Sequence, residues 1–407
     1  MPTPTFSIAS SKHRCWLQPV LERYGWRSGS PANATFFWQL TKKLLPRSNG
    51  ATAFNCLPNL LLLDDKAVLA LLTRRFTRTR PLVTHVNYGE WDDTRIESLN
   101  TRWSEPGCDE PRWWIIKDAH SSNGFSAALF DRSVRPLHKT DVSGGYCYVV
   151  QEYVERPLLV DGRKFEMRQY VLICGDGSAY TYDGALMRLA CVPYEVDSTD
   201  RRAHITNKWV QTGWEASNEL GATLDDLERL ASEWPPYAQL LDDKIVPLVS
   251  DLADAVIPLL TSGQRAQAGG GSGGGSPHHF ELMACDLVVT EEGEVHLMEV
   301  NINPAFGAFL PRTEERLIKP LFEDLLTLCV LPTREGGGLP ARAGRFRRVR
   351  APGLAVAATA ASGSDDDVVT RELQAHLAYV TFKKSSRKRY EHKVGDERPL
   401  VLSAQPC

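Results

Sequence analysis

Alternating apolar and polar positions mark the clearest element of the chain, a predicted β-hairpin over residues 280–307. The segment reads FELMACDLVVTEEGEVHLMEVNINPAFG, and its polar centre is typical of a tight turn. With a four-residue loop at 291–294, Asp286 lies opposite Glu299, and Asn301 shares their face because side chains alternate along a strand. The opposite face is then expected to hold Leu287, Val289, Met298 and Val300.

Two carboxylates and an amide oxygen on rigid strands suit Mg²⁺ carried by a nucleotide, because Mg²⁺ prefers oxygen ligands. An ordinary hairpin with one solvated face is the alternative. The charged residues interrupt otherwise apolar strands, which favours the metal site.

Other patterns predict helices and loops. A helical pattern runs from Asp64 to Phe76, and a long helix or helix pair is expected from Thr223 to Thr261, with Thr223 and Asp226 as a capping box. The run GGGSGGGS predicts a flexible loop, placed at 264–277.

These patterns divide the 407 residues into three parts. An N-terminal α/β region is expected at 1–105 and an α+β core at 106–332, where strands and helices alternate. The segment 333–407 is rich in Gly, Ala, Ser and Arg, so we expect a disordered basic tail.

Composition narrows the function classes. With 43% apolar residues, 24% charged residues and a net charge of -3, the chain resembles a soluble globular protein without a nucleic-acid or membrane partner. It has no apolar run of membrane-spanning length and no signal-peptide pattern. Nine scattered cysteines without a C-x-x-C pair indicate reduced thiols in the cytoplasm.

Three further clusters carry candidate chemistry. In RWWIIKDAHSSNG, an apolar strand ends at Lys117 before a small-residue loop, which is a candidate phosphate cradle or simply a surface turn. In GRKFEMRQYVLIC, Lys164, Glu166 and Arg168 share one strand face, either lining a cleft or facing solvent. The third cluster combines Arg188 of TYDGALMRLA with the polar residues of HITNK, namely His204, Thr206 and Asn207.

The order of these pieces resembles the tubulin tyrosine ligase-like family, whose catalytic core is an ATP-grasp fold. The matching segments are FNCLPNLLLLDDKAVL, WWIIKDA, VVQEYVERPLLVDGRKFEMRQYVL, YDGALMRLA, HITNK and FELMACDLVVTEEGEVHLMEVNINP. They cover roughly residues 54–325. Two of them are long and specific: the segment that contains QEYVERPLL and GRKFEMR, and the hairpin segment that ends in EVNINP.

The resemblance implies ATP and Mg²⁺ as cofactors and gives each residue a role. Lys66, Lys117 and Lys164 would neutralise phosphates, and Gln151, Glu152, Tyr153 and Val154 would hold adenine, partly through backbone groups. Glu166, Thr206 and Asn207 would contact the nucleotide, and Arg168 and Arg188 the carboxylate or acyl-phosphate end of the substrates. Asp286, Glu299 and Asn301 would bind Mg²⁺.

The chain departs from the family pattern at two places. Glu166 stands where K-F-D-x-R has aspartate, and the phosphate loop HSSNGFS is poor in glycine. In that loop Asn123 lies near the expected basic position and Ser126 replaces a glycine. The intact lysines and hairpin favour an active enzyme, with weakened activity as an alternative.

The implied reaction joins a free amino acid to an acidic C-terminal tubulin tail in the cytoplasm, on the cytoskeleton or in a cilium or flagellum. Tyrosine, glutamate and glycine are all candidates, and the oligomeric state is open. A non-tubulin acceptor and a non-catalytic microtubule-associated relative are the alternatives. The basic stretch at Arg74, Arg75, Arg78 and Arg80 is either a guide for the acidic tail or a solvated helix face.

Overall fold

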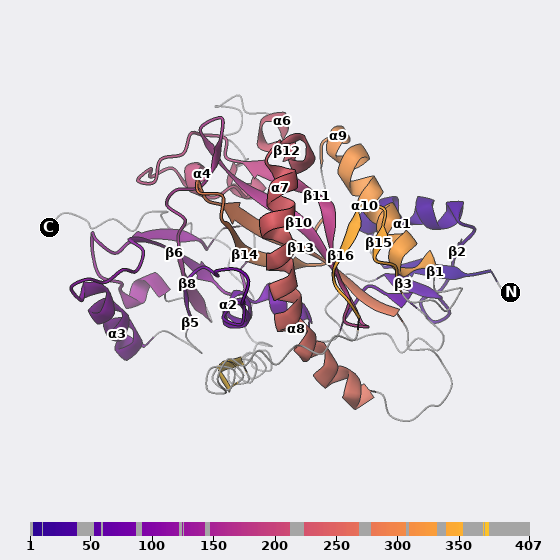
Figure 1. Cartoon of the computed structure of the whole chain (residues 1–407), viewed down its shortest axis with the longest axis horizontal. Helices are drawn as coiled ribbons and strands as arrows, with labels where there is room; N and C mark the ends of the chain where they lie inside the picture. Colours follow the sequence, from indigo (N-terminus) through magenta and orange to yellow (C-terminus); the bar gives the residue numbers. More distant parts are fainter. Residues whose placement is uncertain are drawn as a thin grey trace.

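The structure is a computed structural model with a mixed α/β architecture of two β-sheets and packed helices (Figure 1). It describes residues 3–9, 11–38, 53–57, 60–86, 92–121, 124, 126–142, 147–211, 224–267, 278–306, 309–331, 339–352, 369 and 371–373.

The larger sheet has twelve strands within the described residues, and its centre is formed by long antiparallel strands. Its main path is β15 (Arg342–Ala343), β16 (Phe346–Arg350), β11 (Ala179–Leu189), β10 (Arg163–Cys174), β13 (His278–Val289), β4 (Ala53–Phe54), β3 (Phe36–Trp38), β1 (Thr5–Ile8) and β2 (Arg27–Ser28). Three more strands pair off this path: β12 (Glu228–Leu230) with β11, β14 (Val295–Ile302) with β13 and β9 (Leu159–Val160) with β10.

The predicted hairpin is present as β13 and β14, and Asp286 pairs with Glu299 as expected. The register shifts by one residue between Asp286 and Leu287, so Leu287 pairs with Leu297. This β-bulge inserts Met298 as an extra residue on β14. Leu287, Val289 and Val300 are buried in the core, but Met298 lines a pocket, so its predicted place on the apolar face is wrong.

Each face of the central strands packs against a different group of helices because buried side chains alternate along β10 and β13. Met167 and Val171 belong to a core shared with the long helix α8, whereas Tyr170 and Leu172 belong to a core shared with α1 and α10. The helices of the first core are η1 (Leu60–Asp64, 3₁₀), α2 (Lys66–Thr73), α7 (Tyr237–Leu240), η4 (Leu241–Ile245, π) and α8 (Val246–Gln267). Those on the other face are α1 (Ser11–Arg23), η5 (Glu314–Ile318, π) and α10 (Lys319–Cys329), and the short α9 (Pro311–Thr313) directly precedes η5.

The smaller sheet consists of β5 (Thr84–Val86), β8 (Tyr148–Glu152), β6 (Trp113–Asp118) and β7 (Ala128–Asp131). Helix α3 (Asp93–Ser104) packs on it through Ile96, Leu99 and Trp103, which share a core with Trp114 and Phe130. The short helical segments elsewhere are η2 (Lys139–Val142), α4 (Arg201–His204), α5 (Lys208–Gln211), α6 (Leu224–Leu227) and η3 (Ala231–Glu233).

Two predicted helices differ from the structure. The pattern Asp64–Phe76 is confirmed in its central part as α2, which Asp65 caps by accepting from the backbone N–H groups of Ala67 and Val68. The long helix or helix pair predicted for Thr223–Thr261 is wrong over its first part, because strand β12 and a 3₁₀ turn lie between α6 and α7. It is confirmed from Tyr237 onward in α7, η4 and α8. Thr223 lies outside the described residues.

Helix α8 continues to Gln267, so the flexible loop predicted at 264–277 is wrong for its first four residues, and the glycine run itself lies outside the described residues.

The predicted disordered tail is also wrong for residues 342–350. There β15 and β16 extend the large sheet, with Thr181 of β11 opposite Arg347. Phe346 is fully buried and its ring stacks edge-on against Tyr182 at 4.8 Å between centroids. Arg350 donates to the Asp254 carboxylate and the Gly177 carbonyl. Most residues beyond 352 lie outside the described part of the chain.

Strands from both sides of the predicted division at residue 105 lie in each sheet: β4 pairs with β13, and β5 pairs with β8. The division therefore does not separate two sheets. Across the described residues, no helix has the length and apolar character needed to cross a membrane.

Candidate functional site

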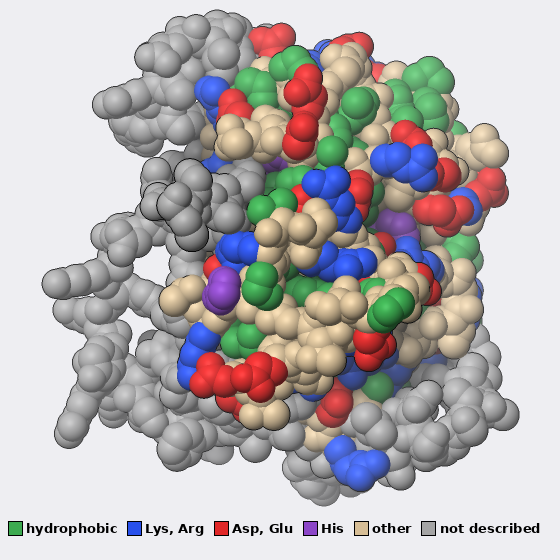
Figure 2. All heavy atoms as spheres, turned by 90° about the vertical axis from the view of Figure 1, so that its left-hand side faces the viewer, with side chains coloured by type: hydrophobic (Ala, Val, Ile, Leu, Met, Phe, Trp, Pro, Cys, Tyr) green, Lys and Arg blue, Asp and Glu red, His purple; other side chains and the backbone are tan. Residues whose placement is uncertain are grey.

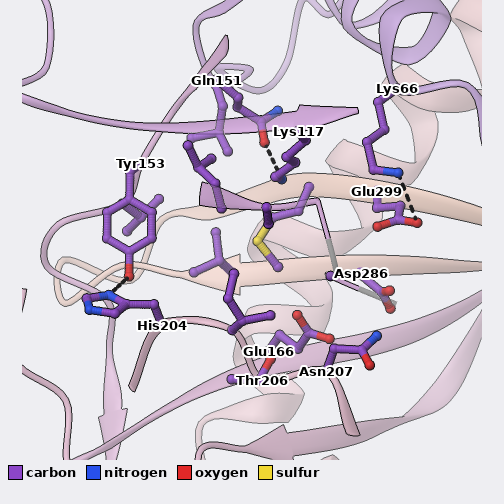
Figure 3. Close-up of a pocket in the computed structure, with 18 of the residues that line it drawn as sticks. Lys66, Lys117, Gln151, Tyr153, Glu166, His204, Thr206, Asn207, Asp286 and Glu299 are labelled. Carbon is purple, nitrogen blue, oxygen red and sulfur yellow. Dashed lines mark hydrogen bonds and ion pairs between the residues drawn. The ribbon is translucent and has the colours of Figure 1, made fainter. Parts of the chain in front are cut away.

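A pocket lies between the two sheets, where β6 and β8 of the small sheet face β10, β13 and β14 of the large one (Figure 3). Its cavity of about 110 Å³ can hold several molecules of water size, whereas a neighbouring cavity of about 10 Å³ holds one at most. Two of the three predicted Mg²⁺ residues, Asp286 and Glu299, line the pocket. So do all ten predicted nucleotide residues: Lys66, Lys117, Gln151, Glu152, Tyr153, Val154, Lys164, Glu166, Thr206 and Asn207.

Three lysines enter this pocket from different elements, and each donates to an oxygen without formal charge, although Lys66 also lies 3.7 Å from the Glu299 carboxylate. Lys66, at the start of α2, donates to the Ser121 carbonyl at 2.6 Å. Lys117 on β6 donates to the Gln151 amide oxygen at 2.8 Å. Lys164 on β10 donates to the Tyr153 hydroxyl at 2.9 Å. Such partners orient an ammonium group without neutralising it.

The charged form of two of these lysines is disfavoured by burial in the pocket. Burial lowers the pKa of Lys117 to about 8, although Glu299 acts in the opposite direction. Burial also lowers the pKa of Lys164 to about 7, opposed by Glu166. An anionic ligand would reverse both shifts because it favours the charged ammonium.

The predicted substrate arginines lie behind the pocket, bound to its carboxylates. Arg168 makes two hydrogen bonds to Asp286, at 2.8 and 2.7 Å, and Arg188 lies 2.9 Å from the same carboxylate. Arg188 also pairs with Glu166, its cross-strand partner. Burial alone would raise the pKa of Asp286, but the two guanidinium groups lower it to about 2. Binding of a substrate carboxylate by these arginines therefore requires an exchange of partners.

The predicted Mg²⁺ residues lie together but differ in charge compensation. Asn301 donates its amide N–H to Asp286 at 3.0 Å, which leaves its amide oxygen for a cation. Glu299 lies 3.7 Å from the Lys66 ammonium. Burial raises the pKa of Glu299, and Lys66 only partly opposes this. A partly buried carboxylate such as Glu299, whose side chain is 30% exposed, fits a divalent cation when a second carboxylate lies beside it.

The predicted adenine segment lies along one side of the pocket, but two of its side chains have other partners. Gln151 holds Lys117 and Thr84, and Glu152 pairs with Arg80 and accepts from the Val83 N–H. The backbone N–H groups of Glu152 and Tyr153 donate to the carbonyls of Val83 and Trp113. Those two N–H groups are therefore committed within the protein.

The HITNK segment contributes one residue, His204, to which the sequence analysis gave no role in ligand binding. Thr206 and Asn207 line the pocket as predicted, and so does His204, whose Nδ1 lies 2.9 Å from the Tyr153 hydroxyl (Figure 3). His204 stood out in the sequence only as part of a polar run. Its role depends on a contact with a residue 51 positions away, which no local pattern reports.

The candidate phosphate loop contacts the residues at the start of helix α2. His120 lies 3.1 Å from Asp65, and the Lys66 backbone N–H donates to the Ala119 carbonyl. Gly124 has a φ of +72°, and a Cβ there would lie 2.8 Å from the Ile205 side chain. Glycine is therefore required where this loop meets the HITNK segment. Asn123 lies outside the described residues.

The basic stretch forms ion pairs within the protein. Arg74 pairs with Glu372, Arg78 with Asp251 and Arg80 with Glu152. Figure 2 shows basic side chains in separate groups interspersed with acidic ones on the face that it presents. These arginine side chains are 39–61% exposed and paired within the protein, which favours the solvated face over a guide for an acidic tail.

The family model for the tubulin-tyrosine ligase family matches residues 47–337 of this chain, so the protein belongs to that family.

Individual relatives are distant. A probable tubulin–tyrosine ligase of Saccharomyces cerevisiae is 23% identical over 292 residues, which are 61% of this chain and 37% of that protein. A probable tubulin polyglutamylase of Mus musculus is 25% identical over 296 residues, 68% of this chain and 49% of that protein. An inactive polyglycylase of Homo sapiens is 28% identical over 228 residues, 48% of this chain and 32% of that protein. The matched regions span a third to a half of these relatives.

Proposed function

We propose that the protein is an ATP-dependent carboxylate–amine ligase with an ATP-grasp-type core. The observation that carries this proposal is the excess of buried positive charge at one pocket. Besides the Glu152–Arg80 pair, three lining lysines (Lys66, Lys117 and Lys164) and two arginines behind them (Arg168 and Arg188) accompany three carboxylates (Glu166, Asp286 and Glu299). A polyphosphate complements such a site, because a buried excess charge is unfavourable without a counter-ion.

In the proposed reaction, an oxygen of the substrate carboxylate attacks the γ-phosphorus of ATP, and ADP leaves. The acyl phosphate formed is attacked at its carbonyl carbon by an amine, which loses a proton as inorganic phosphate leaves and the amide forms. The lysines stabilise the charge on the phosphates and the rigid strands align the reactants, which are the main contributions of proteins to phosphoryl transfer.

Asp286, Glu299 and Asn301 would hold Mg²⁺, which supplies charge neutralisation on the phosphate oxygens. Asp286 would need to release part of its contact with Arg168 and Arg188 to do so. Glu299 has no such commitment to an arginine among the described residues, so it is the more available ligand.

The proposed acceptor is an acidic tubulin tail, and the proposed donor is a free amino acid. The relatives named as a tubulin–tyrosine ligase and a tubulin polyglutamylase support this choice. A different protein acceptor and a catalytically weak relative remain the competing functions, the second because one relative is named as inactive.

The test incubates the protein with tubulin, ATP, Mg²⁺ and mixed amino acids, and measures ADP release and the tail masses. We expect amino-acid additions in the wild type, and a loss of orders of magnitude in turnover for Glu299→Gln, which removes one charge at constant volume. Additions on unrelated acidic peptides but not on tubulin would replace the acceptor. No ADP with any acceptor, while nucleotide still binds, would favour the weak relative.

A further inference from the structure

One lysine of the pocket is connected to a chain of hydrogen bonds that runs along the pocket lining and ends at the Ser198 carbonyl. The Lys164 ammonium lies 2.9 Å from the Tyr153 hydroxyl, which lies 2.9 Å from His204 Nδ1. The opposite ring nitrogen of His204 lies 2.9 Å from the Ser198 carbonyl. All three side chains are at least 95% buried, which makes the geometry of the chain a fixed property of the fold.

The direction of every bond in this chain follows from donor and acceptor chemistry. A carbonyl only accepts, so His204 Nε2 carries the proton and donates to Ser198. Nδ1 of a neutral imidazole then accepts, and it accepts from the Tyr153 hydroxyl. The hydroxyl oxygen is left to accept from Lys164. Burial lowers the pKa of His204 to about 4, which agrees with a neutral ring near pH 7.

The chain also fixes the position of the ammonium. The Lys164 nitrogen lies 4.3 Å from the centre of the Tyr153 ring and 5.9 Å from that of Tyr194, so both rings face a positive charge. Neutral oxygen and aromatic rings favour the charged lysine without cancelling its charge. The ammonium has two further hydrogens to donate, and Lys164 lines the pocket beside Tyr153 and His204.

We propose that Tyr153 and His204 are positioning residues that aim the Lys164 ammonium at the phosphates of a bound nucleotide. This rests on the proposed function only in taking a nucleotide as the pocket ligand. Tyr153 thereby acts through its hydroxyl, in addition to the backbone role predicted for its segment.

Other charged groups near the chain act alongside it. Glu166 favours the charged form of Lys164, and Lys117 disfavours it. Near His204, Asp200 and Asp197 favour a positive ring, whereas Lys164 opposes it. Because Tyr153→Phe removes none of these charges, a change in the titration of Lys164 in that variant reports the lost hydroxyl.

The experiment measures ADP affinity by calorimetry between pH 6 and 9, together with thermal unfolding, for the full chain. For Tyr153→Phe we expect at least a tenfold higher Kd at pH 7. The loss of affinity with rising pH should also begin at a lower pH than in the wild type, since the charged lysine has lost an acceptor. A purely structural role would lower the unfolding temperature without moving this pH profile.

Two further variants separate positioning from packing. His204→Leu removes the acceptor for Tyr153 and should weaken ADP binding severalfold, whereas His204→Asn retains an acceptor and should restore much of it. Tyr180→Phe is the matched control, because Tyr180 is buried and its hydroxyl donates to the Pro340 carbonyl, away from the pocket. It should leave the Kd and the pH profile unchanged.

Wild-type affinity and an unshifted pH profile in Tyr153→Phe would overturn the proposal. A wild-type protein that binds no ADP would overturn both this inference and the proposed function. A protein that binds ADP with the expected effect of Tyr153→Phe but forms no amide would overturn the proposed function alone.

Discussion

Lys117 and Lys164 carry the same charge as the arginines beside the pocket but have a different kind of partner. Lys117 is held by an amide oxygen and Lys164 by a hydroxyl, whereas Lys66 has both a carbonyl and the Glu299 carboxylate nearby. The arginines are held by carboxylates, with Arg168 in a bidentate pair to Asp286. The difference indicates two roles. The charge of these lysines is available to a ligand, whereas the arginines stabilise the strands that carry the acidic residues.

The arginine side of this comparison is tested by Arg168→Ala. Arg168→Ala leaves Arg188 as the charged partner of Asp286, and breaking a buried ion pair typically costs about 3–5 kcal/mol of folding stability. We expect a loss of this size in urea unfolding. Arg156→Ala is the control, since Arg156 pairs with Glu291 and Glu292 at an exposed turn and should change stability by less than about 1 kcal/mol. Equal effects of the two variants would contradict a structural role for Arg168.

The lysine side is tested by Lys117→Met, which removes a buried positive charge and keeps the chain length. We expect ATP affinity to fall about 10- to 100-fold, since hydrogen bonds to charged groups contribute about 1.5–3 kcal/mol. The free energy of unfolding of the ligand-free protein should stay within about 1 kcal/mol or rise. Calorimetry and urea unfolding measure the two quantities. A large loss of stability with unchanged affinity would make Lys117 a structural residue like Arg168.

The pH dependence sharpens the same comparison. The pKa values of Lys164 and Lys117 are about 7 and 8 in the fold, below the ordinary lysine value of about 10.4, so the unfolded chain binds more protons between pH 7 and 10. Their contribution to ligand-free stability therefore rises with pH in this window, while the affinity for an anion falls. The measurement is the unfolding temperature of the wild type from pH 7 to 9, relative to the double variant Lys117→Met/Lys164→Met. If the unfolding temperatures of the wild type and the double variant change in parallel with pH, the two lysines have ordinary pKa values.

Local patterns were sufficient to predict the hairpin and the row of charges on β10. Alternation placed Lys164, Glu166 and Arg168 on one face, and the structure confirms that Asp286 lies opposite Glu299. The resemblance supplied Lys66, which the structure brings to the same pocket across 233 positions from Glu299.

Features that depend on distant partners were missed. The bulge at Met298 changes the register without changing the alternation of residue types, so its pocket position was hidden. Arg168 and Arg188 form ion pairs with Asp286, whereas the sequence analysis expected the arginines to bind substrate and Asp286 to bind Mg²⁺. Residues 346–350 read as part of a basic tail because three arginines mask the buried Phe346.

The position of β16 has a consequence for how the chain is made. Until residues 346–350 leave the ribosome, the outer edge of β11 opposite them, at 179–182, has no strand to pair with. Unpaired strand edges can pair with other chains. β10, β11 and β13 can already form a sheet before β16 is made. While the residues between β13 and β16 are made, the nascent sheet therefore exposes the unpaired edge of β11 at 179–182.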